Sequence, residues 1–208
     1  MIALTTYESR LNADADWALR EGSMHFDSNN SVFRTLKKTE TRLKELGIDY
    51  AIAGGMALFH HGYRRFTDDV DILVTREGLR TIHEKLSGLG YLPPFTGSKN
   101  LRDAETGVKV KFLITGDFPG DGKPKPIAFP DPALVSESVG GVQCVRLKTL
   151  VELKLASGTA PWRLKDLADV QEMIRVLKLP FEFANQLNPF VRESYRTIWN
   201  QVQSAPQE

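Results

Sequence analysis

The clearest pattern of hydrophobic positions runs from Ser31 to Gly47. Small or apolar residues recur there at alternating spacings of four and three, at Val32, Leu36, Thr39, Leu43 and Leu46. This is the period of an α-helix with one buried face, and glycine readily adopts the left-handed backbone that ends many helices. The pattern therefore predicts an amphipathic helix that stops at Gly47.

Beyond this helix, short apolar runs alternate with turn residues, and helical periodicity returns toward the C-terminus. Strands are expected over four short segments: 49–53, 69–74, 108–114 and 141–147. Helices are expected over five further segments: 56–61, 77–86, 150–156, 164–177 and about 188–202. The segment between the last two expected strands, residues 115–132, is rich in Gly, Pro and Asp and predicts a long loop.

This order of elements predicts an α/β (α+β) fold, in which a mixed sheet is flanked by helices and followed by a C-terminal helical lobe. We expect three parts along the chain. Residues 1–30 are polar and weakly patterned and are assigned as an N-terminal arm, for which a helical arm and partial disorder are both open. Residues 31–147 form the core, and residues 148–208 form a helical lobe packed on that core.

The composition of the chain removes several classes of protein. The 208 residues include 27 Lys and Arg against 26 Asp and Glu, and a net charge of +1 gives no overall attraction to nucleic acid or an anionic membrane. The single cysteine, Cys144, excludes an intrachain disulfide and is expected to be a small buried hydrophobe. No signal-peptide pattern and no apolar run of about 20 residues is found, so a cytoplasmic location without membrane insertion is expected.

The chemistry is concentrated at the expected strand over 69–74, which begins with Asp69 and Asp71. Side chains alternate between the two faces of a strand, so both carboxylates point to one side. Two adjacent carboxylates repel each other unless a cation lies between them. Mg²⁺ prefers hard oxygen ligands and is often bound by one or two carboxylates together with substrate phosphates. The pair therefore predicts a magnesium site that also receives phosphates.

Four further residues before this strand fit the same interpretation. Gly54 and Gly55 lie between a strand and a helix, where glycine lets the backbone approach a phosphate. Arg65 is expected to pair with phosphate or to anchor the loop, and Thr67 to hydrogen-bond the loop or the strand start. A glycine pair alone is usually a turn, and an Asp-x-Asp alone is usually a solvated strand end. Their combination in this order favours a site for phosphate and metal.

The whole segment AIAGGMALFHHGYRRFTDDVDILVT, residues 51–75, resembles the signature of the DNA polymerase β superfamily. The pattern Arg-x-Thr-x-Asp-Val-Asp is similar to that of minimal nucleotidyltransferases of bacteria and archaea, which include abortive-infection toxin-like and antitoxin-like proteins. The resemblance implies a polymerase-β-type core in which Asp69 and Asp71 are catalytic and bind Mg²⁺ or Mn²⁺. It also implies a nucleoside triphosphate substrate and a hydroxyl acceptor, which is a transfer RNA end, a protein or a small molecule.

The resemblance extends into the expected helical lobe. Residues 150–174 are similar to the helices that follow the catalytic sheet in these proteins, and this similarity implies that Lys154, Lys165 and Asp166 flank the nucleotide, with Arg163 and Asp169 nearby. The alternative is a surface charge cluster that pins two helices together.

The sequence departs from the family at the usual third carboxylate, where Lys111 stands. A charged lysine cannot bind magnesium, and three explanations are open. The base comes from elsewhere, such as Glu105, Asp117 or the acceptor; or Lys111 replaces one metal's charge and binds phosphate; or transfer activity is lost and nucleotide binding kept. Asp68 offers no ready substitute, because the residue next to Asp69 is expected on the opposite face.

Three functions follow in order of preference. The first is a magnesium-dependent nucleotidyltransferase, with activity impaired by Lys111. The second is a weakened or inactive nucleotide-binding module in a toxin–antitoxin pair, whose partner is a cognate antitoxin or toxin. The third is a structural domain without a ligand. The segment 120–126, GDGKPKP, lacks the spacing of a Walker loop and is expected to be an exposed loop, with a role in covering the substrate as the alternative.

Overall fold

A single mixed sheet organises the computed structural model, which describes residues 6–204. Its strands follow the order β3-β4-β5-β2-β1-β7-β6. Their bounds are β1 Tyr50–Ala53, β2 Asp69–Val74, β3 Tyr91–Leu92, β4 Leu101–Asp103, β5 Lys109–Ile114, β6 Ser136–Val139 and β7 Val142–Val145. The central strand β2 pairs antiparallel with β1 and parallel with β5, so the sheet is mixed as the sequence predicts.

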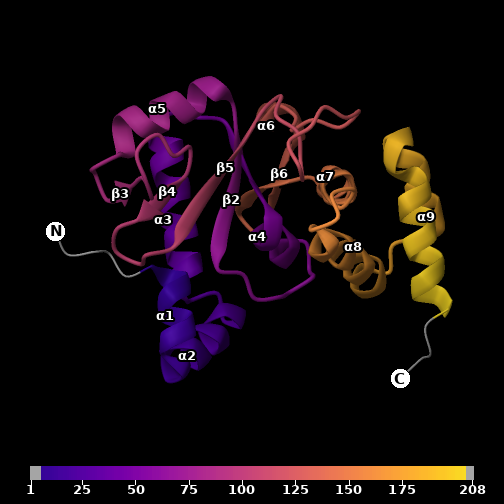
Figure 1. Cartoon of the computed structure of the whole chain (residues 1–208), viewed down its shortest axis with the longest axis horizontal. Helices are drawn as coiled ribbons and strands as arrows, with labels where there is room; N and C mark the ends of the chain where they lie inside the picture. The colour runs from indigo at the N-terminus through magenta and orange to yellow at the C-terminus, as the bar shows by residue number, and fades with distance from the viewer. Residues whose placement is uncertain (1–5, 205–208) are drawn as a thin grey trace.

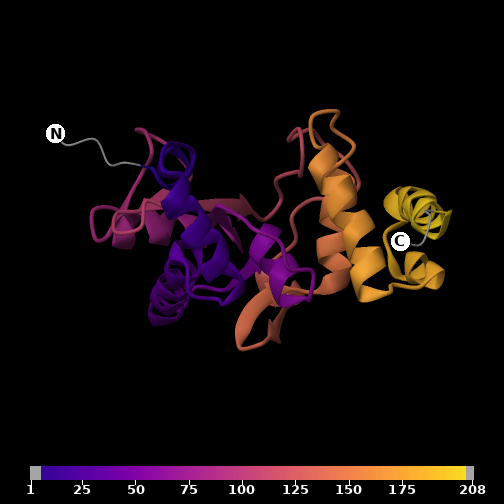
Figure 2. The same ribbon diagram turned by 90° about the horizontal axis from the view of Figure 1, so that it is seen from below.

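Helices cover the sheet and extend beyond one end of it (Figure 1). Their bounds are α1 Tyr7–Ala13, α2 Ala15–Phe26, α3 Ser31–Glu45, α4 Gly54–His60, α5 Arg76–Leu86, α6 Pro132–Val135, α7 Leu147–Ser157, α8 Leu164–Leu177 and α9 Pro189–Ser204, with a 3-10 helix, η1, at Phe181–Gln186. In Figures 1 and 2, α7 and α8 lie between the sheet and α9, while α1 and α2 lie at the opposite end of the molecule. The expected helical lobe thus flanks the sheet.

The sequence pattern locates most of the long elements. The expected helix over 164–177 coincides with α8, and the helix expected to stop at Gly47 is α3, after which Gly47 has a positive φ of 63°. The strands expected over 69–74 and 108–114 are β2 and β5. Cys144 is buried in β7, as expected of a small hydrophobe.

The N-terminal arm is more ordered than its weak pattern indicates. Residues 1–5 lie outside the described chain, but α1 and α2 follow, and each is capped by a side chain that accepts from the first turn. The face that α2 buries is partly polar. Glu21 accepts hydrogen bonds from the Tyr7 hydroxyl at 3.0 Å and from the Ser31 backbone at 2.9 Å. Because hydrogen bonds replace apolar contacts there, the hydrophobic pattern does not reveal these helices.

The burial of β2 fixes the orientation of its acidic residues. Val70, Ile72 and Val74 are fully buried, whereas Asp69 and Asp71 are only partly buried. The apolar face of the central strand is therefore held in the core, and the carboxylates are held on the other face, beside β5. Among residues 6–204, no helix is long and apolar enough to cross a membrane.

Candidate functional site

The centre of the candidate site is the carboxylate face of β2. In the sheet register, Asp71 lies beside Ala53 of β1 and beside Lys111 of β5. Asp69 lies two residues earlier on the same face and accepts a hydrogen bond from the Thr67 hydroxyl at 3.1 Å. Both acids are fixed by a central strand, so their positions do not depend on a loop.

The glycine pair packs directly against these residues. Gly54 has a φ of +57°, and a Cβ atom there would lie 1.9 Å from a carboxylate oxygen of Asp71. A Cβ atom on Gly55 would lie 2.7 Å from the Thr67 side chain. Only glycine fits both positions without moving the acidic strand or its hydrogen bond. The start of α4 therefore lies directly against the carboxylate face of β2.

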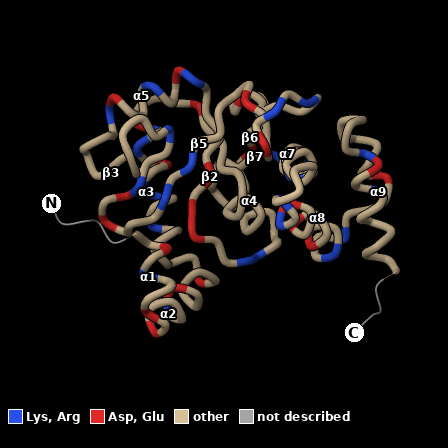
Figure 3. Tube along the Cα trace, viewed as in Figure 1, with Lys and Arg blue, Asp and Glu red and all other residues tan. Residues whose placement is uncertain are grey.

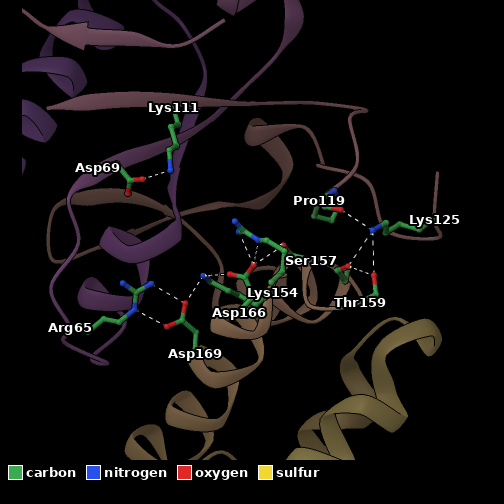
Figure 4. A network of polar contacts seen from close by, with 12 residues as sticks. Arg65, Asp69, Lys111, Pro119, Lys125, Lys154, Ser157, Thr159, Asp166 and Asp169 are labelled. Atoms are coloured by element: carbon green, nitrogen blue, oxygen red, sulfur yellow. Dashed lines mark hydrogen bonds and ion pairs between the residues drawn. The ribbon is translucent and has the colours of Figure 1, made fainter. Parts of the chain in front are cut away.

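Lys111 provides positive charge beside the two acids. Its ammonium group contacts the Asp69 carboxylate directly, as Figure 4 shows. Burial alone would lower the pKa of Lys111, but the negative charges of Asp69 and Asp71 outweigh burial and raise it. For Asp71, desolvation and the neighbouring charge of Asp69 raise the pKa to about 6, although Lys111 and Lys154 act in the opposite direction. Negative charge at Asp71 is therefore incompletely balanced.

A buried charge cluster lies next to the carboxylate face and joins three parts of the chain (Figure 4). Lys154 of α7 donates to Asp166 at 2.7 Å and to Asp169 at 2.6 Å, both on α8. Arg65, in the segment between α4 and β2, donates to the two oxygens of Asp169 at 2.7 and 2.9 Å. The cluster joins α7 to α8, but it is buried and not on the surface as the expected alternative has it, and it holds the Arg65 segment as well.

Asp166 is ionised more readily than an ordinary aspartate. Burial would raise the pKa of Asp166, but the charge of Lys154 and hydrogen bonds from Lys154 and Ser157 lower it below its usual range. Arg163 also donates to Asp166, at 2.7 Å, although about half of its side chain is exposed. Lys165 is exposed at the rim of the same region.

Two adjoining hollows open onto the carboxylate face, each with a volume of about 280 Å³. The first, here the polar hollow, has walls that include Gly55, Thr67, Asp68, Asp69, Trp162 and Lys165. The second, here the mixed chamber, has walls that include Lys99, Leu113, Phe118, Phe129, Leu150 and Leu153. Both are bounded by Asp71, Lys111, Lys154, Arg163 and Asp166. The hollows therefore meet at the acidic strand, and the charges that flank it are visible as blue and red segments in Figure 3.

The ten residues expected at the site lie around these hollows or in the charge cluster beside them. They are Gly54, Gly55, Arg65, Thr67, Asp69, Asp71, Lys111, Lys154, Lys165 and Asp166. The two substitutes considered for the missing base lie elsewhere. Glu105 is 71% exposed and pairs with Lys38, and Asp117 pairs with Arg76 at 3.2 Å. Asp68, expected on the opposite face, precedes β2, where strand alternation does not apply, and it lines the polar hollow.

Sequence reasoning missed several residues that the fold brings to the site. Ser157 hydrogen-bonds Asp166 from the end of α7, and Phe118 and Phe129 lie on a loop without periodicity. Trp162 is 72% exposed at the rim of the polar hollow. Trp162 is followed by Arg163 and Lys165, and an aromatic residue just before basic residues is a local signal that could have marked this rim.

The donors available for a metal are oxygen atoms. In the described part of the chain, no group of three or more His, Cys, Asp or Glu side chains is arranged to hold a metal ion. Asp69 and Asp71 are a two-carboxylate set, which suits a cation that completes its shell with substrate phosphates and water. The raised pKa of Asp71 fits a place where added positive charge is favourable.

Comparisons of sequence give no relative, because no protein-family model and no curated protein matches the chain. Comparisons of structure find solved structures to which this chain is similar. ANT(2")-Ia in complex with adenylyl-2"-tobramycin has 13% identity and a TM-score of 0.47, over 82% of this chain and 98% of that chain. An antigenic nucleotidyltransferase-like protein from Paracoccidioides brasiliensis has 16% identity and a TM-score of 0.48, over 83% and 88% of the two chains. A candidate nucleotidyltransferase from Thermotoga maritima has 20% identity and a TM-score of 0.41, over 70% and 91%.

Proposed function

We propose that the protein is a metal-dependent nucleotidyltransferase, which transfers a nucleoside monophosphate from a nucleoside triphosphate to a hydroxyl acceptor and releases pyrophosphate. The observation that carries this proposal is the pair Asp69 and Asp71 on one face of a central strand, where Asp69 lines the polar hollow and Asp71 lies at the junction of the two hollows. A pair of carboxylates fixed in this way, with cations around them and glycine backbone beside them, is suited to hold polyphosphate through a divalent cation.

Asp69 and Asp71 would hold Mg²⁺ or Mn²⁺, since both are oxygen donors and Asp71 lacks full charge compensation. When bound, the metal supplies positive charge that offsets the charge of the reacting phosphate. Lys111 already contacts Asp69, so it competes with a metal for that carboxylate. This competition supports an enzyme with weakened rather than optimal activity, because one carboxylate must exchange its partner before binding.

The cationic side chains around the site, apart from Lys111, divide into two groups. Arg65 and Lys154, expected from the sequence to neutralise phosphate, already have buried carboxylate partners. Their proposed role is to position α7, α8 and the segment before β2. Lys165 is exposed at the polar hollow, and about half of the Arg163 side chain is exposed there although Arg163 also donates to Asp166. These two side chains are therefore the ones proposed to pair with phosphate oxygens. Gly54, with Gly55, would let the backbone approach those phosphates.

The proposal is tested by incubating the purified protein with each α-labelled nucleoside triphosphate, Mg²⁺, and cellular RNA, protein and small molecules. We expect label transfer by the unmodified protein and none by Asp71→Asn, because one metal-binding carboxylate is then lost. Asp16→Asn, at an exposed position of α2, is the matched control and keeps full transfer. Transfer by Asp71→Asn at the normal rate would contradict the proposal, and the labelled fraction identifies the acceptor class among RNA, protein and small molecules.

A nucleotide-binding module without transfer activity, acting with a partner protein of a toxin–antitoxin pair, is the second candidate. The contact between Lys111 and Asp69 favours it, since a fixed ammonium on one carboxylate hinders metal binding. The incubation with labelled nucleoside triphosphates also distinguishes the two functions, when nucleotide binding is measured alongside label transfer. Magnesium-dependent binding of a nucleoside triphosphate, without label in any fraction, would support the binding module and contradict the enzyme.

A further inference from the structure

The mixed chamber adjoins the polar hollow and shares its charged boundary, including Asp71 and Arg163, but its apolar walls are not used by the metal and phosphate interactions described above. We infer that the mixed chamber binds the hydroxyl acceptor, and that this acceptor is a compact molecule or end group with an apolar body and a neutral or negative charge. The inference rests on the proposed function, because it assigns the second substrate of that same site.

The in-line geometry of phosphoryl transfer indicates which reacting group occupies each of the two hollows. In phosphoryl transfer the attacking oxygen and the leaving oxygen lie roughly in line, on opposite sides of the phosphorus atom. The polar hollow suits the leaving pyrophosphate, because its walls carry Gly55, Thr67 and the exposed Lys165. The attacking hydroxyl must then approach from the other side of the junction, which is the mixed chamber.

In the transfer step, one bond forms and one bond breaks between the acceptor and the nucleoside triphosphate. The acceptor oxygen forms a bond to the α-phosphorus, and the bond from that phosphorus to the bridging oxygen of the pyrophosphate breaks. The bond electrons leave with the pyrophosphate, and the hydroxyl proton passes to water. No oxidant, reductant or further co-reactant is needed.

The wall of the mixed chamber is held in place by the loop that precedes α6. Lys125 donates to the Pro119 carbonyl at 2.8 Å and to Asp121 at 2.9 Å, and its side chain is only 8% exposed (Figure 4). A Cβ atom on Gly120 would lie 2.6 Å from the Ser157 carbonyl oxygen, so the loop lies tightly on the end of α7. The GDGKPKP segment therefore anchors the chamber wall, and a preformed wall lowers the entropic cost of binding.

The chemistry of the walls defines the class of acceptor. Apolar surface comes from β5, the loop and α7, through Leu113, Phe118, Phe129, Leu150 and Leu153. Of the charged lining residues, four are cationic and two are acidic: Lys99, Lys111, Lys154, Arg163, Asp71 and Asp166. An apolar body is therefore favoured, and a positive charge on the acceptor is disfavoured. A volume of about 280 Å³ limits the occupant to a small molecule or an end group.

The test uses three probes that share a phenol ring and a short side chain and differ in charge. They are 3-(4-hydroxyphenyl)propionate, 4-ethylphenol and tyramine. Their binding is measured by ligand-observed NMR, at millimolar concentration, with Mg²⁺ and a non-hydrolysable nucleoside triphosphate analogue present. We expect the anionic and neutral probes to bind together with the nucleotide, and tyramine to bind at least about tenfold more weakly.

Two substitutions locate the probes. Leu113→Trp adds volume to the chamber, and we expect it to weaken probe binding at least about tenfold more than nucleotide binding. Phe118→Ala removes apolar wall from the loop and should also weaken the probes more than the nucleotide. Leu134→Trp, on α6 at a position that is 71% exposed, is the size-matched control and should change neither affinity.

Three outcomes would overturn the inference. They are displacement of the probes by the nucleotide, which would place the nucleoside in the chamber; tightest binding by tyramine; and probe binding that is absent or insensitive to both Leu113→Trp and Phe118→Ala. Failure of the proposed function is distinguishable from these, because it is seen in the label-transfer assay or as loss of binding of the nucleotide analogue, and neither readout involves the probes. The probes and the two variants would still decide whether the chamber is a binding site.

Discussion

At the scale of single residues, the two acids of β2 have different surroundings. Asp69 has the Lys111 ammonium and the Thr67 hydroxyl as partners, whereas Asp71 is bordered by glycine backbone and by a second carboxylate. Desolvation and the charge of Asp69 raise the pKa of Asp71 to about 6, from an ordinary value of 3.8. A side chain whose ionised form is destabilised in the free protein, and which is nevertheless held rigidly in a hollow, is characteristic of a functional site.

This difference gives a prediction for stability against pH. A raised pKa means that the folded state binds the Asp71 proton more tightly than the unfolded state. The stabilisation from this proton is complete below about pH 4 and is lost as pH rises through about 6. Asp71→Asn should therefore raise the free energy of unfolding of the metal-free protein at about pH 8 by on the order of 1–3 kcal/mol, which is seen as a higher melting temperature. It should have little effect at about pH 4. Thermal unfolding that shows destabilisation at pH 8 would contradict this.

At the scale of elements, the buried charge cluster fixes α7 and α8 relative to the sheet. Lys154 lies between two aspartates of α8, and Arg65 ties the segment before β2 to the second of them, Asp169. The contact of Arg65 with Asp169 joins residues 104 positions apart, so no local pattern could predict it. A buried ion pair is worth little against a well-packed apolar substitute, but removal of one partner leaves an uncompensated charge in the interior.

Lys154→Met is therefore expected to destabilise the fold by up to about 3–5 kcal/mol, because Asp166 and Asp169 lose their shared buried cation and keep only one arginine partner each. Urea unfolding of the purified proteins measures this difference. Lys148→Met is the matched control on the same helix, since the Lys148 side chain is 49% exposed and pairs with Glu152 at 3.6 Å. The control should lose less than about 1 kcal/mol. Equal losses in both variants would show that the cluster has no special role.

At the scale of the whole molecule, the sequence predicted the elements that have strong apolar periodicity. The strand with Asp69 and Asp71 was predicted because alternation and a glycine pair are local signals. Strands β3 and β4 have only two and three residues, too few for a recognisable pattern. The mixed chamber could not be predicted, because it forms where a long loop meets α7 and its lining residues are far apart in sequence.

The account's central claim is that Asp69 and Asp71 bind a divalent cation together with a nucleoside triphosphate. The most direct measurement is the anomalous scattering of Mn²⁺ in crystals grown with a non-hydrolysable nucleoside triphosphate. We predict an anomalous peak in contact with the carboxylates of Asp69 and Asp71, triphosphate density in the polar hollow, and loss of the peak in Asp71→Asn. Nucleotide bound with its manganese away from both carboxylates would contradict the claim.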